Sequence, residues 1–499
     1  MLLLPLLFAG GASSAYYLRL HRIASGQSVA GLPRVAAPTA GRRILVLAPH
    51  CDDETLGVGG MIADARRAGA EVAVAFLTNG DGFRVAASRE LREVRLTPHD
   101  YVRFAERRQK ESMAALRELG VPEARIHFFG YPDRGLESLW EGNWERANPY
   151  RSFYTGHIRS PYPRSYTPRA VYCGASLLAD VTRLMREVKP TEIYVTHPAD
   201  DHPDHSAAAA FVQAALLAAR DRDEPWARSA RLRYYLVHRG DWPLPQGRFP
   251  DRPLTPPASL AALDTRWEAY HLSAPARAAK ARALGRYESQ MAVAGRFLAS
   301  FVRTNEVYGA LPQLQEGAAA VAAAVPDATR DDVVRYAGAS ADLRSISARQ
   351  NAAGRRLEVR VRTRGPLSPR VQYALRIRAF DGRETRFLAL KLPPLGVRRS
   401  VPPGGDPAVA ARDQAMDVPV LRVAGDALLQ ADVPLSALGL SGEGARRVWV
   451  SAQTRYMDRV PVDRIGYRPF EMDPTVAETA NGGQRRAADF QRGGPHESE

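Results

Sequence analysis

The feature that most limits how this chain can fold is a regular alternation of apolar β-type runs with helical patterns. The apolar runs lie at 42–48, 71–77, 125–130, 192–196 and 231–237. Helical patterns lie near 56–69, 101–119 and 174–188, and another follows His205. Strands that alternate with helices predict βαβ units. We therefore expect an α/β, Rossmann-like domain over 42–312, with helices flanking a mostly parallel sheet.

Two of these strands run into clusters of histidine and aspartate. The first precedes Pro49-His50-Cys51-Asp52-Asp53-Glu54, and the fourth precedes His202-Pro203-Asp204-His205. In an open α/β sheet, ligands bind in the crevice outside the carboxyl ends of the strands. A catalytic zinc site needs three nitrogen or oxygen ligands, one open position and spare carboxylates to move protons. The two clusters therefore predict a metal-dependent active site.

The rest of the chain divides by composition. We expect an apolar N-terminal segment at 1–22, linkers at 23–41 and 313–331, and a polar, disordered tail at 473–499. We also expect helical structure at 265–308. Between 332 and 472, short alternating runs separated by Pro/Gly turns predict an antiparallel β-sandwich. These runs are 356–363, 371–379, 385–391 and 447–453.

Residues 136–172 interrupt the strand–helix pattern with many aromatic side chains among prolines and arginines. A long insertion of this kind is often a lid or a substrate loop. A surface loop that packs on itself is the alternative, and the sequence leaves both open.

The N-terminal segment predicts membrane association. An apolar stretch at 2–17 is followed by Arg19, His21 and Arg22, and no basic residue precedes it. The positive-inside rule would leave the following chain in the cytoplasm. In contrast, Ser13-Ser14-Ala15 resembles the cleavage site of an exported protein. The cytoplasmic face and an exported or periplasmic location therefore both stay open.

Net charge indicates which classes of partner the chain could bind, and the cysteine count bears on disulfides. The chain has 69 Lys+Arg against 54 Asp+Glu, a formal charge of +15. Such an excess favours acidic partners such as anionic lipid or phosphate-bearing glycans, but solvated arginines are the preferred explanation. We expect no nucleic-acid partner, because no zinc-finger, helicase or RNA-binding signature is present. With only Cys51 and Cys173, the chain has no disulfide framework.

The two motifs, in this order and after strands, resemble those of the PIG-L/LmbE-like zinc-dependent N-acetylglucosaminyl deacetylases. The resemblance covers about 42–308. Pro49 stands where that family usually has alanine, Cys51 where it usually has proline, and Asp200 where some members carry a tyrosine. Smaller features agree with the family: Thr78-Asn79-Gly80, Arg108 with Glu111, Gly130-Tyr131-Pro132-Asp133 and Ser289-Gln290.

This resemblance implies a site and a reaction. His50, Asp53 and His205 would bind Zn²⁺. Zinc-bound water would attack the amide of an N-acetylated amino sugar, an N-acetylglucosamine-type glycoconjugate or glycolipid, with Asp52 as general base. His202, if protonated, would stabilise the oxyanion or protonate the leaving amine. Asp204 would hold a histidine ring in its charged tautomer.

Other residues near the motifs carry weaker expectations. Glu54 would cap the helix that begins near Thr55. Cys51 would pack as a small residue, with a thiolate contact to the metal as the alternative. Tyr131, or a tyrosine of 136–172, would polarise the carbonyl in place of the tyrosine missing at 200. Candidate sugar or phosphate contacts are Arg84, Arg89, Arg134 and His238.

Two further functions stay open at this point. Asp-rich clusters also suit two-metal hydrolases of another bond, such as a phosphoester or a different amide. A glycan-binding envelope protein, in which the β-sandwich binds the glycan, is the other alternative. Dinucleotide binding is disfavoured, because Gly57-Val58-Gly59-Gly60 lacks the Gly-x-Gly-x-x-Gly spacing and the acidic cluster would repel a pyrophosphate.

Overall fold

The computed structural model describes most of the chain in two units. The described residues are 29–240, 242–261, 263–311, 325–327, 338–351, 355–380, 385–392, 419–440, 446–457 and 460–472. Residue contacts divide the chain near 318, with 262–264 assigned to the second unit. The segment expected at 1–22, the tail expected at 473–499 and most of the linker expected at 313–331 lie outside the described residues.

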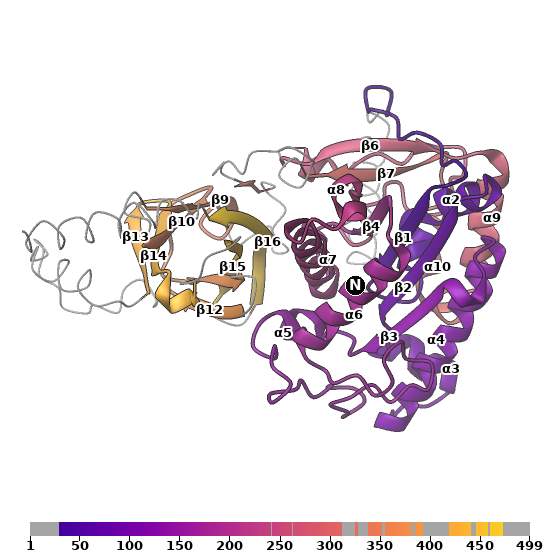
Figure 1. The fold of residues 1–499 in the computed structure, drawn as a ribbon, viewed down its shortest axis with the longest axis horizontal. Helices are drawn as coiled ribbons and strands as arrows, with labels where there is room; N and C mark the ends of the chain where they lie inside the picture. The colour runs from indigo at the N-terminus through magenta and orange to yellow at the C-terminus, as the bar shows by residue number, and fades with distance from the viewer. Residues whose placement is uncertain are drawn as a thin grey trace, which may run out of the picture. The chain divides into compact units, whose positions relative to one another are not determined.

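A seven-stranded sheet forms the centre of the first unit (Figure 1), in the order β3-β2-β1-β4-β5-β7-β6. The five strands from β3 to β5 run parallel to one another. Their bounds are Ile126–Tyr131 for β3, Glu71–Thr78 for β2, Arg43–Ala48 for β1, Glu192–Thr196 for β4 and Arg231–Tyr235 for β5. The expected α/β class with a mostly parallel sheet is confirmed.

The helical expectation for 265–308 is wrong at both ends. Strands β6 (Arg266–His271) and β7 (Asn305–Ala310) pair antiparallel at the edge of the sheet. Helices α9 (Ala274–Gly285) and α10 (Glu288–Ala299) lie between them. Every residue of β7 is buried. A short, fully buried strand has no alternating pattern, so its sequence alone does not distinguish it from buried helix.

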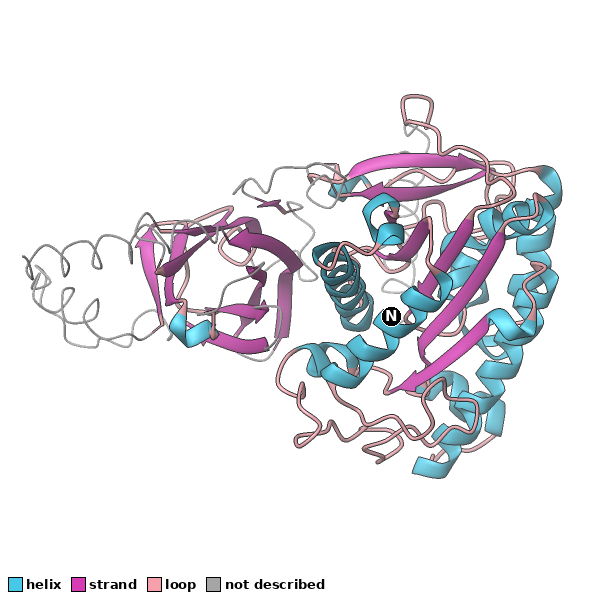
Figure 2. Cartoon of the chain, viewed as in Figure 1, coloured by secondary structure: helices cyan, strands magenta, loops and turns pink. Residues whose placement is uncertain are grey.

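Helices cover both faces of this sheet. Helices α2 (Asp53–Arg67), α4 (Pro98–Glu118) and α9 pack together, and so do α6 (Gly174–Val188) and α7 (Pro203–Asp221). Figure 2 shows these two groups on opposite sides of the parallel strands. Three shorter helices, not expected from the sequence, are α3 (Arg84–Leu91), α5 (Leu136–Trp140) and α8 (Pro225–Ser229).

The glycines after the first motif lie inside α2 and serve close packing. A Cβ at Gly57 would lie 2.1 Å from Cδ2 of Tyr235, and one at Gly60 would lie 2.4 Å from Cδ2 of Leu272. These positions therefore admit no larger side chain without rearrangement. They form no phosphate-binding loop, which agrees with the low expectation for dinucleotide binding.

The aromatic insertion at 136–172 is largely packed onto the domain. Trp140 and Trp144 are buried, and their rings lie 5.0 and 6.1 Å from that of Phe211 in α7. Tyr162 is also buried and donates to Asp81. Phe153, in contrast, is 85% exposed. These contacts favour the self-packed loop over a lid.

The second unit contains two antiparallel sheets, β13-β14-β10-β9-β8 and β12-β11-β15-β16. Side chains from both sheets form one hydrophobic core. The strands of the first sheet are β8 (Val325–Pro326), β9 (Leu343–Gln350), β10 (Arg356–Thr363), β13 (Val420–Gly425) and β14 (Leu428–Pro434). Those of the second are β11 (Val371–Phe380), β12 (Thr385–Lys391), β15 (Arg446–Tyr456) and β16 (Val460–Met472).

Within the described ranges, no helix combines the length and the apolar character that a bilayer crossing requires. The apolar stretch at 2–17, on which the membrane expectation depends, lies outside the described residues.

We expect Gly57→Ala to destabilise the first unit, because its Cβ would overlap the buried Tyr235 ring. Overpacking of this kind costs about 1–3 kcal/mol. Gly285→Ala is the matched control, since no atom lies within 4 Å of its Cβ position. Urea unfolding followed by tryptophan fluorescence measures both. Equal midpoints for the two variants would contradict the packing role of Gly57.

Candidate metal centre and pocket

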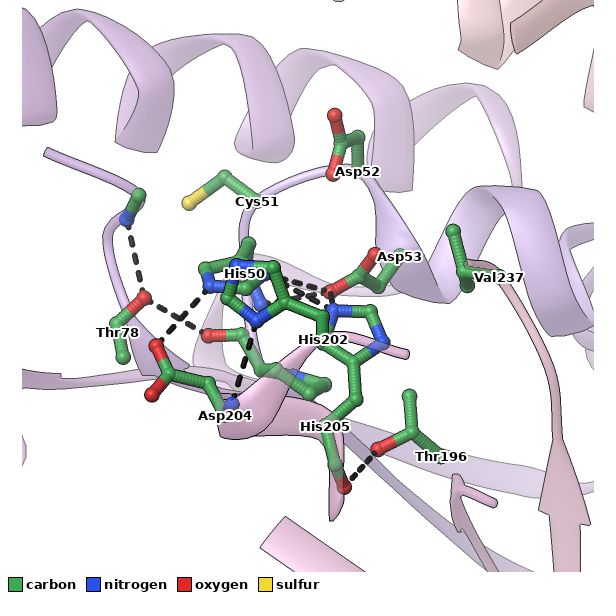
Figure 3. A network of polar contacts seen from close by, with 12 residues as sticks. His50, Cys51, Asp52, Asp53, Thr78, Thr196, His202, Asp204, His205 and Val237 are labelled. Carbon is green, nitrogen blue, oxygen red and sulfur yellow. Dashed lines mark hydrogen bonds and ion pairs between the residues drawn. The ribbon is translucent and has the colours of Figure 1, made fainter. Parts of the chain in front are cut away.

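The two acidic-histidine motifs meet because β1 and β4 are neighbours in the sheet. Leu45 pairs with Ile193 in parallel register, so both strands deliver their following residues to the same edge. His50 lies in the turn after β1, and Asp53 is the first residue of α2. His202 caps the N-terminus of α7, which carries His205 in its first turn. Figure 3 shows these side chains converging.

Three donor atoms form a tight triangle at this edge. His50 Nδ1 lies 3.1 Å from His205 Nε2 and 3.2 Å from Asp53 Oδ2. Asp53 Oδ2 lies 3.1 Å from His205 Nε2. Tetrahedral zinc ligands at about 2.0–2.1 Å from the ion lie roughly 3.3–3.4 Å apart. The three residues that the resemblance implied as ligands therefore fit one small cation.

Carboxylates lie beside the other nitrogen of each ring, with hydrogen-bond geometry for His50 and Asp204 and at ion-pair distance for His205 and Asp200. His50 Nε2 lies 3.2 Å from Asp133 Oδ1 and 3.3 Å from Asp204 Oδ2. His205 Nδ1 lies 3.2 Å from Asp200 Oδ2. Metal-binding histidines usually donate their second N–H to such a group, which fixes the ring and raises its basicity. The ring that Asp204 contacts is that of His50.

These carboxylates also favour a positive charge at the triangle. Burial opposes protonation, but Asp200 and Asp53 raise the pKa of His205 to about 9. Burial likewise opposes ionisation of Asp53, but His205 and His50 hold the pKa of that carboxyl well below its usual range. A proton and a metal ion would therefore compete for the same atoms.

Asp133 and His238, which we did not assign to the metal from the sequence, also reach the site. Asp133 follows β3, and His238 follows β5. Their donor atoms lie within 4.8 Å of the others in the groups His50–Asp133–Asp204 and Asp53–His205–His238. A third group is His50–His202–His205. All three groups share residues with the triangle, but Asp133 and Asp204 lie at the opposite nitrogen of His50, where they support the ring and do not join the three donor atoms. Both residues follow strand ends, the same signal that marked His50 and His202.

Asp52 has a distinct environment. Its backbone adopts φ 135°, and its N–H donates to Glu54 Oε2 at 3.2 Å. Figure 3 shows its carboxylate turned away from the triangle. Burial raises the pKa of Asp52 to about 7, while Arg108, whose Nη2 lies 3.3 Å from Oδ2, opposes that rise. This carboxylate can therefore exchange a proton near neutral pH.

Glu54 holds this turn. Its buried carboxylate accepts hydrogen bonds from the hydroxyls of Thr55 and Tyr287 and from the backbone of Asp52. These contacts agree with the structural role expected for Glu54. They fix the turn before α2, and the acidic side chain also interacts favourably with the N-terminal end of that helix.

His202 lies over the triangle, with ring centroids 4.6 Å from His50 and 5.1 Å from His205. Its Nδ1 accepts the N–H of Asp204 at 3.2 Å, so the ring proton resides on Nε2. Burial and the neighbouring His50 keep the pKa of His202 well below its usual value. The structure thus favours a neutral Nε2–H donor over the charged ring considered from the sequence.

Two expectations for nearby residues have different outcomes. The Tyr131 hydroxyl donates to Asp180 at 2.9 Å, away from the site, so its proposed role as a carbonyl polariser is wrong. Burial raises the pKa of the Cys51 thiol to about 12, and its sulfur belongs to none of the donor groups found among the described residues. A packed small residue fits better than a metal ligand.

A cavity of about 220 Å³, partly open to solvent, lies over the centre. His50, Asp52, Asp53 and His202 contribute to its lining. Of the four candidate sugar or phosphate contacts, Arg134 and His238 also line it. The other two, Arg84 and Arg89, are exposed on α3 and are not among its lining residues.

The chain is similar in sequence to known deacetylases. Residues 45–216 match the family model PIG-L, described as GlcNAc-PI de-N-acetylase. A 1D-myo-inositol 2-acetamido-2-deoxy-alpha-D-glucopyranoside deacetylase from Kineococcus radiotolerans is 30% identical over 205 residues, covering 39% of this chain and 49% of the relative. One from Tsukamurella paurometabola is 28% identical over 248 residues, covering 45% and 77%.

Among solved structures, the N,N'-diacetylchitobiose deacetylase from Pyrococcus horikoshii overlaps 54% of this chain and 84% of its own, at 17% identity and a TM-score of 0.34. The chain spans about half the length of the Kineococcus relative.

We expect one Zn²⁺ per chain. Because His205 is protonated at neutral pH in the metal-free site, binding should release protons and should weaken as the pH falls below about 9. Removing one ligand by His50→Ala or His205→Ala should lower affinity at least tenfold, while the exposed His99→Ala serves as control. Equilibrium dialysis with metal analysis tests this. Two ions per chain would contradict a single centre.

Asp200→Asn should keep the fold but weaken the centre. The amide removes the negative charge beside His205 Nδ1, and its oxygen still accepts the N–H groups of Val237 and His238, while the hydrogen bond from the His202 N–H to Oδ1 is lost. Loss of such a supporting carboxylate typically costs 10–100-fold in metal affinity. Competition titration against a zinc chelator measures the change, and unchanged affinity would show that the negative charge of Asp200 does not contribute to metal binding.

Proposed function

Since the first unit contains a domain of the PIG-L/LmbE-like deacetylase family, we propose that this protein is a zinc-dependent hydrolase that removes the acetyl group from an N-acetylated amino sugar. An N-acetylglucosamine-type glycoconjugate is the substrate class. The observation that carries the proposal is the triangle of His50, Asp53 and His205 donor atoms beneath a cavity that Asp52 also lines.

His50, Asp53 and His205 would hold the ion. A zinc ion bound there supplies two effects: it lowers the pKa of water towards about 7 and polarises an amide carbonyl. The remaining polar groups of the pocket then position the sugar and move protons.

Asp52 is placed to move the proton. Its carboxylate accepts a proton from water as the water oxygen adds to the acyl carbon. The same proton passes to the nitrogen when the C–N bond breaks, so acetate and a free amine result. Asp52 suits both steps because its pKa of about 7 lets it gain and lose a proton near neutral pH.

His202 is placed to stabilise the oxyanion. With Nδ1 occupied by the backbone of Asp204, its Nε2–H is free to donate to the carbonyl oxygen as negative charge develops there. A neutral donor avoids placing an imidazolium beside the positive centre.

For the second unit we propose a β-sandwich, supported by the single core that its two sheets share. Glycan binding by this unit and membrane association through 1–22 are proposals that rest on the sequence alone.

The zinc-loaded protein should release acetate and a primary amine from an N-acetylglucosamine conjugate. Asp52→Asn should lower kcat by about 10²–10⁴ with zinc still bound, because the base is lost. Asp223→Asn, on an exposed side chain, is the matched control. In the unaltered protein kcat/KM should rise with pH through the Asp52 ionisation, because only the carboxylate accepts a proton. Bound zinc would shift this rise in kcat/KM to a pH below the Asp52 pKa of about 7 that holds for the metal-free site.

The proposal fails if no acetate is released from any conjugate in a broad panel and Asp52→Asn behaves like the unaltered protein. Hydrolysis of a phosphoester with two ions bound per chain would instead support a two-metal hydrolase.

A further inference from the structure

One imidazole beside the centre has no role in the reaction proposed above. His238 follows β5 and lines the cavity together with His202. Its ring centroid lies 5.0 Å from that of His205 and 5.7 Å from that of His202. One of its ring nitrogens lies within 4.8 Å of the donor atoms of Asp53 and His205. His238 is therefore close enough to contact a group bound over the triangle.

The carboxylate of Asp200 fixes the backbone of His238 relative to the centre. Its Oδ2 accepts the N–H of His238 at 3.0 Å and lies 3.2 Å from His205 Nδ1. Its Oδ1 accepts the N–H of His202 at 3.0 Å. One buried carboxylate thus contacts all three histidines and holds their relative positions.

Aromatic packing holds the His238 ring, while its nitrogens stay available. Phe297 stacks on the ring at 5.7 Å between centroids and 9° between planes. Phe301 packs edge to face on Phe297, and Trp242 packs in the same way on Phe301. The two ring nitrogens have no hydrogen-bond partner among the described residues. Since a neutral imidazole carries one N–H, the ring can donate one hydrogen bond into the cavity.

Most other donors of the cavity already have partners or lie at its edge. No tyrosine is among the described residues that line it. Arg108 donates to two backbone oxygens, and Gln290 donates to a neighbouring hydroxyl. Arg134 is exposed. The two histidines are therefore the neutral N–H donors beside the triangle.

We infer that His238 is a second catalytic donor, which hydrogen-bonds the acyl oxygen of the substrate together with His202. The inference rests on the proposed function and adds a residue to it. As the water oxygen adds to the acyl carbon, the electron pair of the C=O double bond moves to the acyl oxygen. The N–H groups of both rings stabilise the charge that develops there. Neither ring loses a proton in this step, and the electron pair returns when the C–N bond breaks.

His238→Phe tests the role, because it keeps a ring beside Phe297 and removes the N–H. In the zinc-loaded full chain, kcat for an N-acetylglucosamine conjugate should fall by about 10²-fold with KM little changed, the lower end of the effect of losing one oxyanion donor. His238→Gln retains an N–H donor and should recover part of this loss. His99→Phe, at an exposed position outside the cavity lining, is the matched control. Thermal unfolding confirms that each variant folds, and His238→Ala takes the place of His238→Phe if that variant does not.

An N-trifluoroacetyl substrate tests whether the loss is electronic. Fluorine withdraws electron density, so the acyl oxygen needs less stabilisation as its charge develops. The kcat loss in His238→Phe should therefore be several times smaller for this substrate than for the N-acetyl substrate. Equal losses for both substrates would overturn the donor role, because a general distortion of the site does not depend on the acyl group.

Two binding measurements do not depend on turnover. Zinc affinity, measured by chelator competition, should be the same in His238→Phe and the unaltered protein, whereas a loss of about tenfold or more would make His238 a metal ligand and overturn the inference. A phosphonamidate of glucosamine carries anionic oxygens on a tetrahedral phosphorus and so resembles the addition step. Calorimetry should show that it binds zinc-loaded His238→Phe about tenfold more weakly than the unaltered protein.

These measurements separate the two possible failures. Weaker phosphonamidate binding by His238→Phe, with no turnover of any acylated amino sugar by the unaltered protein, would reject the proposed function and keep His238 as a donor to anionic oxygen. Undiminished turnover and unchanged phosphonamidate binding in His238→Phe would overturn the role of His238 and leave the proposed function intact.

Discussion

The site depends on the parallel pairing of β1 with β4. Because these strands lie side by side and point the same way, two segments about 150 residues apart in the chain place their polar side chains at one edge. The first helical turns of α2 and α7 then aim Asp53 and His205 at the turn that carries His50. If β4 paired elsewhere, the two motifs would still exist, but the donor triangle would not.

The strand ends and the two motifs could be predicted from sequence because each rests on a local pattern. Strands β1, β2, β4 and β5 are buried runs followed by polar residues, and α6 follows a clear apolar period. The same logic failed for β6 and β7, whose short runs flank two helices. It also left α3 unassigned, because that helix has few buried residues and a weak apolar face.

Residues that act through a second residue were the hardest to assign. Asp133 and Asp200 are common residue types in turns, and nothing local marks them as partners of His50 and His205. Asp133 reaches His50 only because β3 lies on the β1 side of the sheet, whereas Asp200 follows β4 and meets His205 through the turn that leads into α7. Tyr131 shows the reverse error. It belongs to a segment that resembles the family, yet its hydroxyl donates to Asp180 of α6 and not to the centre.

The charge balance of the pocket gives these contacts a common cause. Asp53, Asp133, Asp200 and Asp204 are buried around two imidazoles, and Arg108, which pairs with Asp52, is the buried guanidinium on the pocket lining. Uncompensated carboxylates are costly in such a setting, so a proton shared within the His50–His205 pair, whose ring nitrogens lie 3.1 Å apart, would offset part of their charge in the metal-free chain. A divalent cation at the triangle would supply the same positive charge while leaving both rings neutral, as ligands must be. Protonation of the imidazoles and binding of a metal ion then each offset the negative charge of the buried carboxylates. This explains why so many carboxylates surround a centre that needs only one as a ligand.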